Sequence, residues 1–93
     1  MGAAMLAAVK LALRISTAYF DDELNDLIDA AQADLTLCGI NAAHKEDDPL
    51  IKRAVVLYCK AHFGADDNAG RYQQSYDMLK GSLMIAGDYR AGS

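Results

Sequence analysis

The sequence predicts an all-α fold, a small bundle of about four helices with the third helix at its centre. Three observations support this fold class. The 93 residues include one proline and many alanines, a composition that favours helix over sheet. Hydrophobic residues recur at helical spacing. Start and stop signals bracket the periodic segments. We expect one domain over residues 1–93, with no linker and no internal repeat.

The first helix is expected at Ala3–Arg14. Its hydrophobic stripe contains Leu6, Val9 and Leu13, with Met5 and Ala12 beside it. Ser16 and Thr17 then end the pattern, because their hydroxyl groups compete for backbone hydrogen bonds. We expect this helix to be shorter or less firmly docked than the others.

The second helix is expected to begin at Asp21, as an N-cap, followed by acidic residues that suit the helix dipole. Gly39 stands where a left-handed C-terminal residue is needed, and Ile40 can pack back on the helix. The hydrophobic stripe consists of Leu24, Leu27, Ile28, Ala31, Leu35 and Cys38. The opposite, exposed face is expected to hold Asn25, Asp26, Asp29, Gln32 and Asp34.

The third helix follows a polar loop over Asn41–Asp48. Asp48 is a suitable N-cap, Pro49 a suitable first residue, and the helix should run to Phe63 with Gly64 as its stop. Its hydrophobic residues cover more than one narrow stripe, which predicts a central helix with neighbours on several sides. These residues are Leu50, Ile51, Ala54, Val55, Leu57, Tyr58, Ala61 and His62.

The fourth helix is expected from Asn68 to Ala86, after a turn at Asp66–Asn68. Gly81 either admits a close partner helix or is a tolerated glycine on an exposed face. Gly87 ends the helix, and residues 88–93 are expected to be extended or frayed. The hydrophobic stripe consists of Tyr72, Tyr76, Leu79, Leu83 and Ala86, so the tyrosines on it are expected in the core.

Charge and cysteine content narrow the function classes. The net charge is −4, whereas a domain that binds phosphates should carry a basic face. Direct nucleic-acid binding is therefore disfavoured. Cys38 and Cys59 lack metal-ligand spacing and are expected to be buried or half-buried thiols in a reducing compartment. A chain this short has a thin margin of stability, for which oligomerisation is a common remedy.

No pattern of catalytic residues stands out. Cys59 and His62 could touch on one helix, but nothing supplies an oxyanion hole. A calcium loop that begins at Asp66 fails at its glycine and glutamate positions. We therefore expect no enzyme, no cofactor and no metal. The hydrophobic run at Ala3–Leu13 is too short to span a bilayer and carries Lys10, which predicts a cytoplasmic protein.

The ordered set of segments resembles the head–tail connector family of tailed bacteriophages and prophages, also labelled phage DNA-packaging proteins. The similarity extends from about Leu6 to Tyr89, and no single motif in it is diagnostic. The segments that carry it are Asp21–Leu24, Leu27–Ala31, Asp48–Tyr58, Tyr76–Leu83 and Gly87–Tyr89.

This resemblance implies a structural subunit of the virion, made in the bacterial host cytoplasm. Copies of the chain would form a ring under the portal protein, extend the DNA channel and dock the tail or a stopper protein. DNA would pass without sequence-specific binding, and an acidic protein suits such a channel because it does not attract phosphates. Alternatives are another assembly adaptor, a small enzyme, and a small helical DNA-binding regulator, which would need a polar or basic recognition helix.

Two sets of residues are predicted to make contacts in the assembly. In a ring built by head-to-tail contacts, an acidic patch would meet a basic patch of the neighbour: Asp21, Asp22 and Asp26 against Lys52, Arg53 and Lys60. Asp88, Tyr89 and Arg90 are predicted to dock a partner, since tyrosine and arginine are frequent interface anchors. The tail after Gly87 is expected to be ordered by that partner and not by its own fold.

Overall fold

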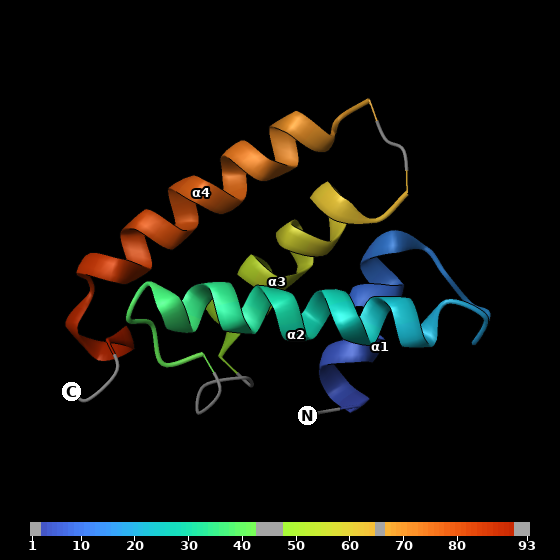
Figure 1. The fold of residues 1–93 in the computed structure, drawn as a ribbon, viewed down its shortest axis with the longest axis horizontal. Coiled ribbons are helices and arrows are strands. Elements are labelled where there is room, and N and C mark those ends of the chain that lie inside the picture. Colours follow the sequence, from blue (N-terminus) through green and yellow to red (C-terminus); the bar gives the residue numbers. More distant parts are fainter. Residues whose placement is uncertain (1–2, 43–47, 65–66, 91–93) are drawn as a thin grey trace.

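The computed structural model describes residues 3–42, 48–64 and 67–90. Within these residues the chain forms four α-helices and one short 3₁₀ helix, η1 (Figure 1). The all-α prediction is confirmed, and each predicted helix is found with ends that differ by few residues. The elements are α1 (Ala3–Leu13), α2 (Asp21–Leu37), α3 (Pro49–His62), α4 (Ala69–Ile85) and η1 (Gly87–Tyr89).

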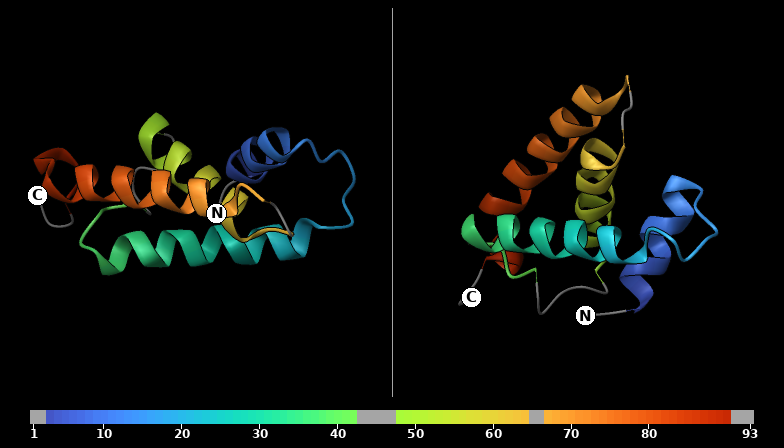
Figure 2. Two further views of the ribbon diagram at one scale, coloured as in Figure 1. Left: turned by 90° about the horizontal axis from the view of Figure 1, so that it is seen from above. Right: turned by 45° about the vertical axis from the view of Figure 1, so that its right-hand side comes forward.

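The third helix is the centre of the fold, as the sequence predicts. It packs against α1, α2 and α4, and Figure 2 shows α2 on one side of the molecule with α3 and α1 on the other. Its fully buried side chains include Ile51, Ala54 and Val55. A helix that is hydrophobic on several faces can bury them all only between several neighbours, which explains its place.

The first helix is better docked than its sequence suggests. Met5 and Val9 are buried, and α1 contacts both α2 and α3. Leu6 and Leu13 are partly buried and pack against the same core. With 11 residues, α1 is the shortest of the four α-helices in the described residues, as expected, and its buried side chains attach it to the core.

The predicted end of α2 is confirmed. Gly39 has a φ of 85°, and the amide of Ile40 donates to the carbonyl of Leu35 over 3.0 Å. The amide of Gly39 donates to the carbonyl of Thr36 over 2.9 Å, which completes a Schellman motif. Ile40 and Leu35 are both fully buried, so the turn returns the chain to the core.

The helix starts follow the predictions less evenly. Asp48 caps α3, since its carboxylate accepts from the amide of Leu50 over 2.8 Å, as predicted. Asp21 is not the N-cap of α2 but its first helical residue, and Phe20 at the cap offers no side-chain hydrogen bond. The Asp21 carboxylate lies instead 2.8 Å from the ammonium of Lys10 on α1.

The residues after α4 are held by the chain itself, which corrects the prediction of a tail ordered by a partner. The amide of Asn41 donates to the carbonyl of Tyr89 over 2.7 Å, and Ile40 forms a β-bridge with Arg90. The Tyr89 hydroxyl donates to the carboxylate of Asp48 over 2.8 Å. The loop after α2 thus supplies partners for backbone groups that a frayed end would leave to water. Residues 91–93 lie outside the described part of the chain.

The predicted polar face of α2 is only partly exposed. Gln32 is buried, with 6% of its surface exposed, and Asp34 is half-buried. Both residues flank the hydrophobic stripe, at positions that neighbouring elements cover. The hydrophobic pattern of one helix does not show how far its neighbours cover its sides. The exposure predicted for Gln32 and Asp34 was wrong for this reason.

Candidate functional site

Three side chains form a polar lock between α2 and α4. The Tyr76 hydroxyl donates to Oδ2 of Asp34 over 2.6 Å, and Nζ of Lys80 approaches the same oxygen at 3.0 Å. The ammonium of Lys80 also lies 5.1 Å from the centre of the Tyr76 ring. Each of the three side chains has a polar partner in the other two, so the lock helps to position α4.

The protonation of the lock follows from these contacts. The hydrogen bond from Tyr76 and the charge of Lys80 outweigh partial burial and lower the pKa of Asp34. Burial and the neighbouring carboxylate raise the pKa of Tyr76 above its ordinary value. Burial alone would lower the pKa of Lys80, but its bond to Asp34 raises it. At neutral pH the lock is therefore an ionised carboxylate with two donors.

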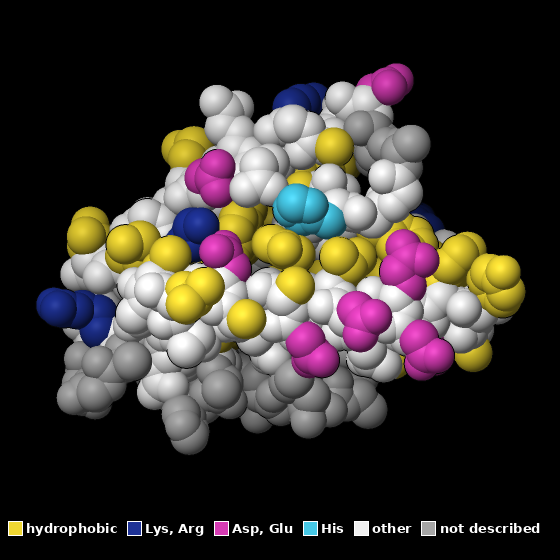
Figure 3. Space-filling model, viewed as in Figure 1, with side chains coloured by type: hydrophobic (Ala, Val, Ile, Leu, Met, Phe, Trp, Pro, Cys, Tyr) yellow, Lys and Arg dark blue, Asp and Glu magenta, His cyan; other side chains and the backbone are white. Residues whose placement is uncertain are grey.

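The predicted acidic patch lies at the start of α2 and is largely accessible. Asp22 and Asp26 are exposed, and Figure 3 shows acidic side chains gathered in a row over α2. Asp21 is different, because its carboxylate forms an ion pair with the ammonium of Lys10 within the subunit, over 2.8 Å. Two of the three predicted acidic residues thus remain available to a neighbour.

The predicted basic residues do not form one open patch. Arg53 is exposed, whereas Lys52 is half-buried. Lys60, also half-buried, places its ammonium 5.2 Å from the centre of the Tyr72 ring on α4. A cation held over an aromatic ring is partly engaged within its own subunit. Arg53 is therefore the most accessible of the three.

The predicted docking residues at the C-terminal end divide into two kinds. Asp88 and Arg90 are exposed. Tyr89 is half-buried, and its hydroxyl is bound to Asp48. Any partner at this end would therefore meet the two charges, while the aromatic ring serves the fold.

The cysteine and histidine on α3 have structural roles. Cys59 is fully buried, and burial raises the pKa of its thiol to about 12, so a nucleophilic thiolate is not formed at neutral pH. His62 bonds through Nε2 to Oε1 of Gln73 over 3.0 Å and stacks on Tyr58. Among the described residues, no three acidic, histidine or cysteine side chains meet as metal ligands would. No helix in that part of the chain has the length and hydrophobicity to cross a bilayer.

Large hydrophobic side chains are exposed at the two ends of the molecule, a feature that the sequence reading missed. At one end, Leu11 near the close of α1 is 80% exposed and Tyr19 before α2 is 84% exposed. At the other end, Leu37 closing α2 is 87% exposed and Ile85 closing α4 is 86% exposed. Figures 1 and 2 place these helix ends at opposite extremes of the long axis. Exposed hydrophobic side chains that form a contiguous patch mark interaction sites, whereas single ones, such as Met78 at 72% exposed, are common.

The described residues form an all-α fold with large exposed hydrophobic side chains at its two ends. A family described as "Phage connector protein" matches residues 5–90. The chain belongs to this phage connector protein family, which gives it a structural role in the phage particle. Comparisons with curated proteins and with solved structures return no match.

Proposed function

We propose that the chain is a head–tail connector subunit: copies form a ring under the portal protein, extend the DNA channel and dock the tail or a stopper protein. The family match over residues 5–90 carries this proposal. The exposed hydrophobic side chains at both ends of the subunit support a ring, because each copy would offer two contact surfaces. The net charge of −4 suits a channel wall that does not retain DNA.

Removal of the gene from the phage genome tests the function directly. The expected result is DNA-containing or empty heads without attached tails, with tailed particles restored when the wild-type gene is supplied in trans. Infectious tailed particles at normal yield without the gene would contradict the proposal. Electron microscopy of the particles separates a connector defect from a defect in head or tail formation.

The predicted acidic and basic contact between neighbours stays part of this proposal, now centred on Asp22, Asp26 and Arg53. Rim charges of this kind steer assembly more than they hold it. Reversal of Lys52 and Arg53 to glutamate should slow assembly at low salt and have less effect at high salt. Reversal of Arg71, an exposed cation at the start of α4, is the matched control. Equal assembly of the double variant and the control at both salt concentrations would remove this contact from the proposal.

The alternative, a small DNA-binding regulator, is disfavoured by the position of α3. A recognition helix must present one face to the major groove, but α3 packs against the three other long helices. Titration with duplex DNA at two salt concentrations discriminates the two functions. The connector should show no specific binding at either concentration, whereas a regulator would retain a sequence-specific complex.

A further inference from the structure

Helices α1 and α2 end in the same Schellman motif, with a different residue at the left-handed position. In α2 that residue is Gly39. In α1 it is Arg14, with a φ of 61°. The motif is complete, since Ile15 donates to the carbonyl of Lys10 over 2.9 Å and Arg14 to that of Leu11 over 3.2 Å. A side chain with a Cβ is strained in this conformation, whereas glycine is not.

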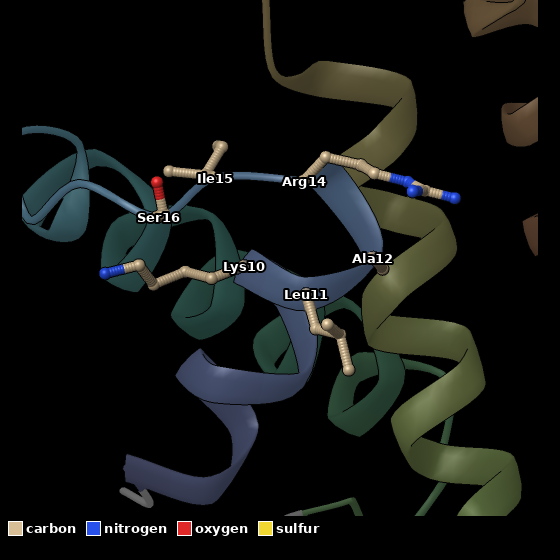
Figure 4. A pocket seen from close by; sticks show the side chains of 6 residues that line it. All are labelled: Lys10, Leu11, Ala12, Arg14, Ile15 and Ser16. Atoms are coloured by element: carbon tan, nitrogen blue, oxygen red, sulfur yellow. The ribbon is translucent and has the colours of Figure 1, made fainter.

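No polar contact of the Arg14 side chain with the described residues offsets this strain. Its side chain is exposed, and it makes no hydrogen bond or ion pair with the residues that the structure describes. Figure 4 shows Arg14 and Lys10 extending in different directions from the end of α1. Because Lys10 is paired with Asp21, Arg14 is the cation still available here. Strain that persists without a contact of its own points to a function outside the subunit.

The surroundings of Arg14 have the character of a contact surface. Leu11, one turn earlier, is 80% exposed, and Tyr19 in the connection to α2 is 84% exposed. A shallow pocket of about 450 Å³ lies at the same place. It is lined by Lys10, Leu11, Ala12, Arg14, Ile15 and Ser16 (Figure 4). This end of the molecule thus combines exposed hydrophobic side chains, a hollow and a positive charge.

The opposite end carries exposed hydrophobic side chains together with charges of both signs. Leu37 and Ile85 project from the last turns of α2 and α4 and are 87% and 86% exposed. Asp88 follows Ile85 by three residues, and both Asp88 and Arg90 are exposed. In Figures 1 and 2, the ends of α2 and α4 lie together at one extreme of the long axis, away from the end of α1. The hydrophobic side chains here could pack against those near Arg14, and Asp88 could pair with Arg14.

We propose that the α1 end of one subunit binds the α2–α4 end of the next, with Ile85 and Leu37 against Leu11 and Tyr19 and with Arg14 against Asp88. The occupant is a second copy of this chain, because the two hydrophobic surfaces, with Arg14 beside one and Asp88 beside the other, lie on opposite ends of one molecule. Such a head-to-tail contact is heterologous and closes into a ring when the rotation allows. The inference rests on the proposed ring and identifies the surfaces that build it.

A charge exchange tests the polar half of the contact. Arg14→Asp and Asp88→Arg alone should each lower the affinity between subunits, by about tenfold for a rim charge. The double variant should restore it, because the pair is re-formed with its signs exchanged. Aspartate is tolerated in the left-handed conformation, so Arg14→Asp should fold. Arg71→Asp, on an exposed cation in the first turn of α4, should leave assembly unchanged. Additive losses without rescue in the double variant would overturn the proposed pair.

Cysteine cross-linking tests the hydrophobic half. Leu11→Cys and Ile85→Cys are introduced into one chain that carries Cys38→Ser, and the assembled protein is oxidised. The expected product is a ladder of disulfide-linked multimers, and the control pair Leu11→Cys with Met78→Cys should give none, although Met78 is 72% exposed. A ring of wild-type size without the ladder would overturn this contact and leave the proposed ring standing. Wild-type protein that stays monomeric, alone and with its portal protein, would overturn the ring and the inference together.

Discussion

The hydroxyl of Tyr76 donates to Oδ2 of Asp34 over 2.6 Å and so joins α4 to α2 across 42 positions of sequence. Lys80 approaches the same oxygen at 3.0 Å. The α3 helix contacts both α2 and α4, but these polar contacts define how the two outer helices meet. The exposed ends of α2 and α4 form one half of the proposed subunit contact, so the lock also positions that surface.

Loss of the hydroxyl should weaken the fold measurably. Tyr76→Phe keeps the ring and removes a hydrogen bond to a charged acceptor, which contributes about 1.5–3 kcal/mol to stability. The Asp34 side chain is 34% exposed, so the lower end, about 1.5 kcal/mol, is expected. Urea denaturation measures it. Tyr72→Phe on the same helix is the control, because the contact of Tyr72 is through its ring. Equal losses in both variants would mean that the lock contributes nothing.

The lock also predicts how stability depends on pH. The pKa of Asp34 is lowered in the folded state, so its contribution is complete above the unfolded pKa of about 4 and is lost as the pH falls through the folded value. The pKa of Tyr76 is raised, so its contribution is lost above about pH 10, where the unfolded chain ionises. Asp34→Asn should reduce the loss of the free energy of unfolding as the pH falls below about 4. If the free energy of unfolding falls equally steeply with decreasing pH in the variant and in the wild type, Asp34 is not the group responsible.

Removal of the Tyr89 hydroxyl should weaken the attachment of the C-terminal segment to the rest of the fold. Tyr89→Phe removes the hydrogen bond to Asp48 and should loosen residues 87–90. Because the Asn41 amide donates to the Tyr89 carbonyl, its hydrogen exchange should accelerate in the variant. Tyr19→Phe, on a tyrosine that is 84% exposed, serves as the control. Unchanged hydrogen exchange at Asn41 would show that the hydrogen bond between Tyr89 and Asp48 does not hold residues 87–90 in place.

The two helix ends should respond in opposite directions to glycine and alanine. Arg14→Gly should raise the free energy of unfolding by about 1 kcal/mol, because it relieves a left-handed residue. Gly39→Ala should lower it by about 1–2 kcal/mol, through conformation alone, since the added Cβ would meet no neighbour within 4 Å. Thermal denaturation of both variants tests the pair. Destabilisation by Arg14→Gly would show that the arginine serves its own subunit, contrary to the inference above.

The central place of α3 predicts a severe effect at its buried face. Val55→Asp puts an unpaired charge at a fully buried position and should unfold the domain, at a cost of several kcal/mol. Leu50→Asp on the same helix is the control, because Leu50 is 44% exposed and stands in the first turn, where an acid suits the dipole. Circular dichroism distinguishes the two. A cooperative melt of the Val55 variant close to wild type would exclude α3 as the hub.

Periodicity and capping residues were sufficient to predict the helices, the end of α2 and the start of α3. They fail where distant segments meet. Nothing local in the sequence shows that Asp34 faces Tyr76 or that Tyr89 reaches Asp48, since both pairs are formed by tertiary packing. One missed feature did leave a signal: residues 14–20 contain no glycine, so a Schellman end in this segment has to place another residue in the left-handed position.

The mass of the purified protein in solution, alone and mixed with its portal protein, tests the connector account most directly. The subunit is 10.0 kDa. The account predicts one closed species, at a fixed multiple of this mass, that forms alone or on the portal. A mass of one subunit at all concentrations, with and without the portal protein, would contradict it.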